Sequence, residues 1–151
     1  MSDLTYTTAS VAETEAVAAT IARECRGGEV IALSGDLGAG KTQFVRGLVR
    51  ALGGNPRAVS SPTFVLLNVY DGGRFTIYHL DAYRVGGADD FEAIGFTELL
   101  EQGGVVAVEW PERVADLLPT RIWRVRLTAL DETRRLIEVL PPAPLPRAAE
   151  G

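Results

Sequence analysis

Residues 35–42 have the composition and spacing of a loop that binds phosphate. They read Gly-Asp-Leu-Gly-Ala-Gly-Lys-Thr and meet the pattern G-x-x-x-x-G-K-[ST]. Glycine lets the backbone wrap closely around an anion, because a side chain would strain the loop or block the approach. Lys41 adds a charge at the β and γ phosphates, and the Thr42 hydroxyl is placed to bind the magnesium ion that bridges them. The loop therefore predicts that the protein binds a nucleoside triphosphate with magnesium.

Two acidic residues compete for the magnesium side of this site. A phosphate loop needs a carboxylate there, usually at the carboxyl end of a neighbouring buried strand. Glu109 directly follows the apolar run 105–108, and Asp81 ends a more mixed strand. In open α/β sheets the carboxyl ends of the strands meet at the ligand crevice, so both acids can reach it. The local context favours Glu109, and the sequence leaves the choice between the two acids open.

Three further residues have chemistry that the pattern leaves undecided. Thr63 follows a Ser-Pro pair, and a rigid corner before proline could present its hydroxyl to the γ phosphate or the metal; the alternative is a plain turn. His79 is the only histidine of the chain, and a lone histidine within a strand is more often packed than catalytic. Trp110 either belongs to the core or lines the nucleotide pocket.

Helices and strands that would position these residues alternate along the chain. Ser10 and Glu13 have the S-x-x-E form of a capping box, which starts a helix. An Asp-Gly-Gly turn at 71–73 joins two β-rich segments as an antiparallel hairpin. The predicted helices cover about residues 10–26, 41–52, two short pieces within 86–102, and 111–117, and the predicted strands cover 4–7, 30–33, 65–70, 74–81, 105–108, 121–130 and 134–140.

Length and composition predict one domain over residues 1–140, and the alternating helices and strands make it α/β. The chain has 151 residues, of which 46% are hydrophobic, and this is enough for a core. The Pro- and Ala-rich tail at 141–151 is expected to be disordered. A net charge of -5 argues against a protein that clamps nucleic acid by general electrostatics.

The number of cysteines and the lack of a long apolar stretch indicate in which cellular compartment the protein is expected. Cys25 is the only cysteine, which excludes an internal disulfide and a cysteine-based zinc site and agrees with a reducing compartment. The amino terminus has no basic and apolar signal, and no run is long enough to span a membrane. We therefore expect a soluble cytoplasmic protein.

Four motifs occur together in one order. They are the phosphate loop at 35–42, Ser-Pro-Thr-Phe at 61–64, His-Leu-Asp-Ala-Tyr-Arg at 79–84 and Val-Glu-Trp-Pro at 108–111. In their order and spacing they resemble the TsaE family of small bacterial ATPases. The resemblance covers about residues 4–140 and includes the segment Ser-Val-Ala-Glu-Thr at 10–14. Four linked motifs are far more specific than a phosphate loop alone, whereas the final hairpin and tail match only loosely.

This resemblance implies a P-loop NTPase-like fold with three layers and a mainly parallel central sheet, with antiparallel hairpin strands added. It implies ATP and Mg²⁺ as cofactors, slow hydrolysis by the isolated protein, and assembly with the subunits TsaB and TsaD. The implied role is support of that complex in forming threonylcarbamoyladenosine next to the anticodon of tRNA. Contact with tRNA is expected to be only indirect, and no membrane contact is expected.

The same resemblance assigns roles to particular residues. It implies that Thr42 and Glu109 bind the magnesium, that Asp81 belongs to a second, switch-like acidic motif near the nucleotide, and that Thr14 lies by the adenine. The expected catalytic residues are Lys41, Asp81 and Glu109. The expected nucleotide-binding residues are Leu37, Gly38, Ala39, Gly40, Lys41, Thr42, Thr14, Thr63 and Asp81.

Two other functions are compatible with a phosphate loop. Many compact P-loop proteins are small-molecule kinases, but these usually carry an arginine-rich lid, and no compact arginine cluster follows Arg84 before Arg113 and Arg121. A GTP-dependent switch would need a sequence that reads guanine, and no N-K-x-D sequence occurs. The kinase therefore remains the alternative to the accessory ATPase.

Overall fold

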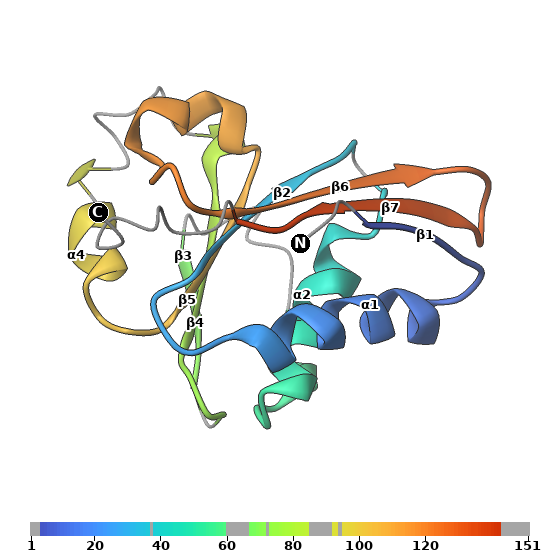
Figure 1. The fold of residues 1–151 in the computed structure, drawn as a ribbon, viewed down its shortest axis with the longest axis horizontal. Coiled ribbons are helices and arrows are strands. Elements are labelled where there is room, and N and C mark those ends of the chain that lie inside the picture. Colours follow the sequence, from blue (N-terminus) through green and yellow to red (C-terminus); the bar gives the residue numbers. More distant parts are fainter. Residues whose placement is uncertain are drawn as a thin grey trace, which may run out of the picture.

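The structure is a computed structural model that describes residues 4–36, 38–59, 67–71, 73–84, 92–93 and 95–142. The described strands form one seven-stranded sheet. Its strands, in spatial order, are β1 (Leu4–Thr8), β7 (Arg135–Leu140), β6 (Trp123–Ala129), β2 (Val30–Ser34), β5 (Val105–Glu109), β4 (Ile77–Asp81) and β3 (Leu67–Tyr70) (Figure 1). The described helices are α1 (Val11–Glu24), α2 (Lys41–Ala51), α4 (Phe96–Leu100) and the 3-10 helices η1 (Pro56–Ala58), η2 (Ala82–Arg84) and η3 (Pro111–Leu117).

The centre of the sheet is parallel and its edges are antiparallel. β2 pairs in parallel with both β5 and β6, and β4 continues the parallel arrangement beyond β5. β3 turns back antiparallel to β4, and β7 and β1 add two antiparallel strands at the other edge. Strands β2 and β5 are apolar without alternation because helices cover both faces of the sheet there. The predicted mainly parallel α/β sheet with antiparallel hairpins is confirmed.

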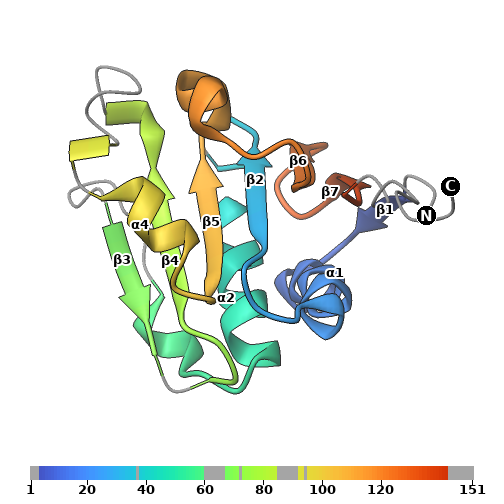
Figure 2. The same cartoon turned by 60° about the vertical axis from the view of Figure 1, so that its left-hand side comes forward.

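Helices lie on both sides of this sheet, which gives three layers. Figure 2 shows α4 in front of β3, β4 and β5, with α2 behind the sheet and α1 beside β1 and β7. The core on the side of α1 and α2 includes Ile21, Phe44, Leu48, Ile31, Leu33 and Ile77. The core on the side of α4 and η3 includes Phe96, Val114, Val30, Ala32, Val106 and Val108.

Helix α1 begins as predicted and ends earlier. The backbone N–H of Glu13 donates to Ser10 Oγ at 3.1 Å, which is the predicted cap, whereas the Glu13 carboxylate accepts from the N–H of Ala9 at 2.8 Å. The helix was predicted to reach about residue 26 but stops at Glu24. The carboxylate of Glu29 accepts from the next backbone N–H groups, those of residues 26 and 27, so these turn away from the helix.

The remaining predicted elements lie close to their expected bounds. Both hairpins form, β3 with β4 and β6 with β7. However, β4 begins at Ile77 and not at residue 74, so the connection after Tyr70 is longer than the predicted tight Asp-Gly-Gly turn. Residues 111–117 form a 3-10 helix, and of the two helical pieces expected within 86–102 the structure describes α4 and residues 92–93. Residues 143–151 lie outside the described residues, so the expected disorder of the tail stays a prediction.

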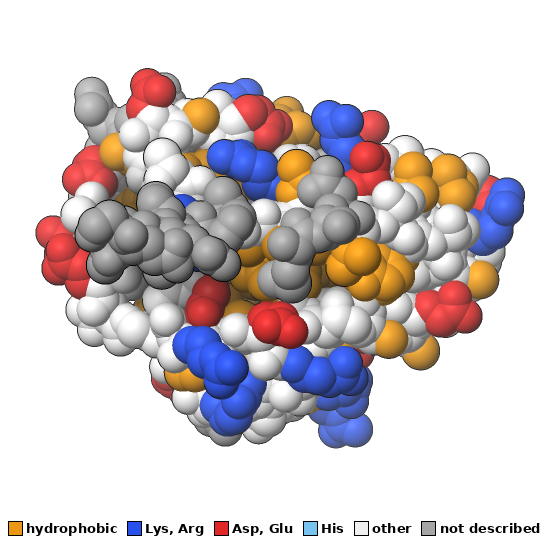
Figure 3. All heavy atoms as spheres, in the orientation of Figure 1, with side chains coloured by type: hydrophobic (Ala, Val, Ile, Leu, Met, Phe, Trp, Pro, Cys, Tyr) orange, Lys and Arg blue, Asp and Glu red, His pale blue; other side chains and the backbone are white. Residues whose placement is uncertain are grey.

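Both acidic and basic side chains lie on the face of the molecule that Figure 3 shows. Several basic side chains gather at its lower edge, and acidic side chains are spread over other parts of this face. The expectation that general electrostatics do not clamp nucleic acid stays a prediction. Within the described part of the chain, no helix has the length and apolar character needed to cross a lipid bilayer.

Candidate functional site

The phosphate-loop sequence joins β2 directly to α2. β2 ends at Ser34 and α2 begins at Lys41, as the motif requires. A Cβ on Gly35 would lie 2.6 Å from the carbonyl oxygen of Leu127 in β6, closer than real side chains come. Gly40, directly before α2, has a left-handed φ of 106°. Both positions therefore need glycine, one for close approach and one for its backbone angle.

The Lys41 side chain is folded back over this loop. It is only 6% exposed, and its Nζ donates a hydrogen bond to the carbonyl oxygen of Gly35. The same Nζ lies 4.0 Å from Oε1 of Glu109. Thr42 follows, half-buried, in the first turn of α2. The lysine charge and the positive end of an eleven-residue helix thus occur at one place, which is suited to an anion.

Trp110 borders the site and does not belong to the core alone. Its indole ring lies under the ammonium of Lys41, 4.3 Å from Nζ to the ring centroid, and against the ring of Tyr83 at 5.0 Å. Trp110 has a φ of 56° and is the only non-glycine residue with a positive φ in the described part of the chain. This backbone costs about 1 kcal/mol, and a cation–π contact offsets about 1 kcal/mol. The strained turn directs the ring toward the lysine.

The two competing acids are neighbours in the sheet. Asp81 and Glu109 are the last residues of β4 and β5 and are paired in the parallel register. Both are buried, with 7% and 5% of their surface exposed. Burial raises the pKa of Asp81 above its ordinary value, and the nearby Glu109 raises it further, while the hydrogen bond from the backbone N–H of Tyr83 and the charge of Lys41 oppose this. The structure therefore brings both acids to the loop.

His79 is packed, and it also holds Glu109. It is fully buried, with Nε2 2.5 Å from Oε2 of Glu109 and Nδ1 3.1 Å from the hydroxyl of Tyr70. The sequence predicted packing but not this contact. The alternation of side chains along the strand could have indicated that His79 lies near the site. His79 and Asp81 are two residues apart in β4 and therefore share one face of the sheet, the face on which α2 packs.

A cavity of about 340 Å³ adjoins the loop on the side of α1. It is lined by Thr14, Gly38, Gly40 and Arg135, among others. Arg135 Nη2 donates to the carbonyl oxygen of Gly38 at 3.1 Å, so the hairpin of β6 and β7 contacts the loop. The Thr14 hydroxyl forms a 2.9 Å hydrogen bond with that of Thr8. Thr14 thus lies at a cavity open to the loop, and its place beside adenine stays a prediction.

A second cavity of about 550 Å³ borders the first half of the loop. Gly35, Asp36 and Ala39 line one side of it, and Trp110 and Arg126 contribute others of its side chains. Cavities of this size are typical of small-molecule sites. The phosphate loop therefore has space for a ligand on both sides.

The donor set suits magnesium more than a transition metal. Among the described residues there is no group of three or more His, Cys, Asp or Glu side chains that could hold a metal ion by itself. Magnesium is usually held by one or two protein oxygens, with phosphate and water completing its shell. The Thr42 hydroxyl and the carboxylates of Glu109 and Asp81 are oxygen donors at the loop, so these residues fit that ion.

Some predicted site residues cannot be placed. Leu37 and the Ser-Pro-Thr corner with Thr63 lie outside the described residues, and their roles stay predictions. Of the others, Gly38 and Gly40 line the cavity toward α1, Ala39 lines the larger one, and Lys41, Asp81 and Glu109 meet at the end of the parallel strands.

Comparison with known proteins identifies the family. The family model described as "Threonylcarbamoyl adenosine biosynthesis protein TsaE" matches residues 8–137. The chain belongs to the TsaE family. The resemblance read from the four sequence motifs is therefore confirmed.

Individual TsaE proteins match over most of their length. The chain is 38% identical over 137 residues to tRNA threonylcarbamoyladenosine biosynthesis protein TsaE of Bacillus subtilis, covering 90% of this chain and 85% of the relative. It is 46% identical over 112 residues to the protein of the same name from Treponema pallidum, covering 74% and 82%. The solved structure of Bacillus subtilis YdiB has a TM-score of 0.76 and 30% identity, and the match covers 94% of this chain and 87% of that one. The P-loop-like fold is thus shared with a solved structure.

Proposed function

We propose that this protein is an accessory ATPase that binds and slowly hydrolyses ATP with Mg²⁺ and so supports TsaB and TsaD in forming threonylcarbamoyladenosine in tRNA. The observation that carries the ATP site is the meeting of buried Lys41 with the buried acids Asp81 and Glu109 at the end of a glycine loop. Membership of the TsaE family, whose relatives are named for tRNA threonylcarbamoyladenosine biosynthesis, supports the pathway. A cytoplasmic location is part of this proposal.

Residues 37–42 of the loop would bind the phosphate groups of ATP. Lys41 exchanges the carbonyl oxygen of Gly35 for phosphate oxygens, and its charge offsets the charge that develops on them. The amide groups at the start of α2 hold phosphate, in the segment formed by Leu37, Gly38, Ala39, Gly40, Lys41 and Thr42.

The metal side is held by oxygen donors of this chain. Thr42 and Glu109 are the proposed ligands, and Asp81 lies next to Glu109 in the neighbouring strand. Thr42 and Glu109 would hold the ion beside the phosphates, where it would supply positive charge that offsets the charge developing on them. Trp110 covers one side of Lys41, with the ring centroid 4.3 Å from Nζ.

The test is the ATPase rate of the purified protein with and without TsaB and TsaD. We expect slow release of phosphate alone and faster release with both subunits. Lys41→Ala should abolish phosphate release with and without the partner subunits. Arg57→Ala, which removes an exposed charge in η1, should leave both rates of release unchanged. Rapid hydrolysis without partners, together with unchanged threonylcarbamoyladenosine in tRNA when the protein is deleted, would refute the proposal. Transfer of the phosphate to an acceptor other than water would favour the kinase instead.

A further inference from the structure

The contacts of Glu109 divide between its two carboxylate oxygens. Oε2 lies 2.5 Å from Nε2 of His79, and Oε1 lies 4.0 Å from Nζ of Lys41. The first distance is that of a strong hydrogen bond, whereas the second is longer than a direct ion-pair hydrogen bond. The carboxylate is therefore tied to the histidine and only close to the lysine.

We infer that His79 is a positioning residue that holds Glu109 away from Lys41, so that Lys41 stays free for phosphate and one oxygen of Glu109 stays free for magnesium. This inference rests on the proposed function of the site. Without the histidine, attraction between opposite charges in a buried place would draw the carboxylate onto the ammonium. The lysine would then be neutralised by the protein itself.

Glu109 determines which nitrogen of His79 donates to it, and Tyr70 contacts the other nitrogen. A carboxylate only accepts hydrogen bonds, so Nε2 is the nitrogen that donates to Glu109. In the neutral ring Nδ1 then accepts, and the hydroxyl of Tyr70 is its donor at 3.1 Å. Tyr70 comes from the edge strand β3 and is itself buried, 6% exposed. The order Tyr70, His79, Glu109 is thus a chain of directed hydrogen bonds that runs from the sheet edge to the loop.

Neighbours of this kind are known to orient metal ligands. A side chain that hydrogen-bonds a ligand and fixes its orientation commonly changes metal affinity or activity by about 10-fold or more when it is replaced. Among the residues that the structure describes, the side-chain hydrogen bonds of His79 go to Glu109 and Tyr70. Its effect on magnesium should therefore pass through Glu109.

The test measures the Mg²⁺ concentration that half-maximally strengthens binding of a fluorescent ATP analogue. His79→Leu should raise this concentration about 10-fold. His79→Gln should stay near the wild-type value, because its amide nitrogen can donate in place of Nε2. Ile77→Val, on the same face of β4, controls for repacking of the core. Thermal unfolding of each variant measures stability separately.

A double-mutant cycle decides whether the effect passes through Glu109. Glu109→Gln alone should raise the Mg²⁺ requirement, and adding His79→Leu to it should raise the requirement no further. If His79→Leu leaves the requirement of the otherwise wild-type protein unchanged while Glu109→Gln raises it, the inference fails and the proposed site stands. If Glu109→Gln has no effect, the magnesium role proposed for Glu109 fails, and the inference fails with it.

If His79→Leu does not fold, the same measurement can be made on the milder variant Tyr70→Phe. Tyr70→Phe keeps the ring and removes only the hydroxyl that donates to Nδ1. It should raise the Mg²⁺ requirement in the wild-type background and leave it unchanged in the Glu109→Gln background. An unchanged requirement in both backgrounds would overturn the inference.

Discussion

The ammonium of Lys41 lies 4.3 Å from the centroid of the Trp110 indole. The lysine of the phosphate loop therefore touches a fluorophore whose own backbone is strained, with a φ of 56°. A ligand that recruits Lys41 must remove a charge from that ring or change its distance from it. This contact makes the state of the loop measurable.

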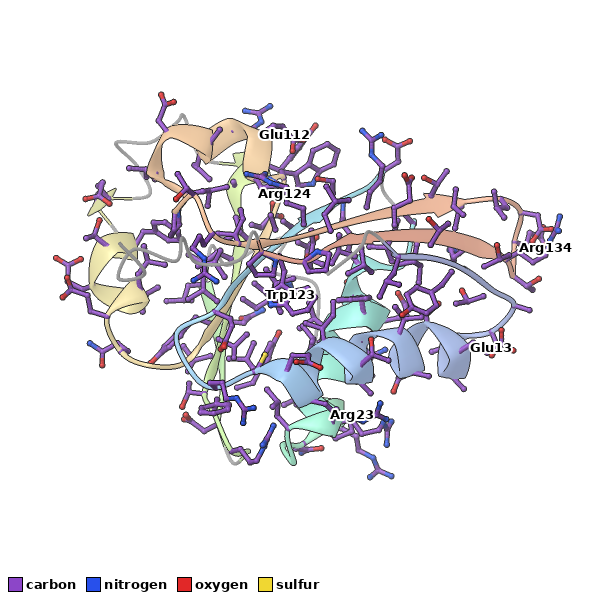
Figure 4. All side chains as sticks on the ribbon, in the orientation of Figure 1. Glu13, Arg23, Glu112, Trp123, Arg124 and Arg134 are labelled. Carbon is purple, nitrogen blue, oxygen red and sulfur yellow. The ribbon has the colours of Figure 1, made fainter. Side chains whose placement is uncertain are left out.

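ATP with Mg²⁺ should change the emission of Trp110, because the cation leaves the indole for the phosphates. Titration of the purified protein with ATP measures the change. Trp110→Phe should abolish it, although Trp123, which lies within the body of the molecule (Figure 4), still emits. Lys41→Ala should also show little change. A full response from the Lys41→Ala protein would mean that the indole senses something other than the lysine.

Asp81→Asn should raise thermal stability at neutral pH. Burial raises the pKa of Asp81, so the folded protein binds this proton more tightly than the unfolded chain does. Stability from this residue is present below the ordinary pKa of 3.8 and is lost as the pH rises through the higher folded value. Asparagine stays neutral and keeps an oxygen for the N–H of Tyr83.

The measurement for Asp81 is the unfolding temperature of both proteins from pH 3 to pH 8. The gain from Asp81→Asn should be full at neutral pH and disappear below about pH 4, where both side chains are neutral. Equal stability at pH 7 would show that the positive charges near Asp81 compensate its burial.

Arg135→Ala should weaken ATP binding about tenfold, since it removes a hydrogen bond from a charged donor that holds Gly38 of the loop. Calorimetric titration measures the affinity. Arg134→Ala is the matched control, because Arg134 lies at the hairpin tip (Figure 4), is exposed and pairs with Asp131. If both variants bind ATP equally well, the contact with Gly38 has no role in the loop.

Cys25 should react with thiol reagents only when the protein unfolds. It is 2% exposed, and burial raises the pKa of its thiol to about 12, so the reactive thiolate is scarce. Labelling with a disulfide reagent at pH 8 in increasing denaturant should follow the unfolding transition. Because Cys25 is the only cysteine, the signal has one source. Rapid labelling without denaturant would indicate local opening at the end of α1.

Local sequence patterns were enough to predict which segments form helices and strands. The strand before the loop, the helix after it, the cap at Ser10 and both hairpins follow from nearest neighbours along the chain, and all are present. Helix α1 ends at Glu24, two residues before the predicted end at about residue 26, and the carboxylate of Glu29 binds the N–H groups of residues 26 and 27. The sequence of the final hairpin does not predict its neighbours in the sheet. That β6 pairs with β2 and β7 with β1 is known only from the structure.

By itself, the sequence determined that this protein has a phosphate loop between a buried strand and a helix, with Lys41 and two strand-end acids available to it. These are properties of short segments, and short segments set backbone angles and residue spacing. Only the tertiary structure decided that His79 holds Glu109, that Trp110 lies under Lys41 and that Arg135 reaches Gly38. Each of these contacts joins residues of different elements, and their distances depend on sheet register and helix packing, which no local pattern encodes.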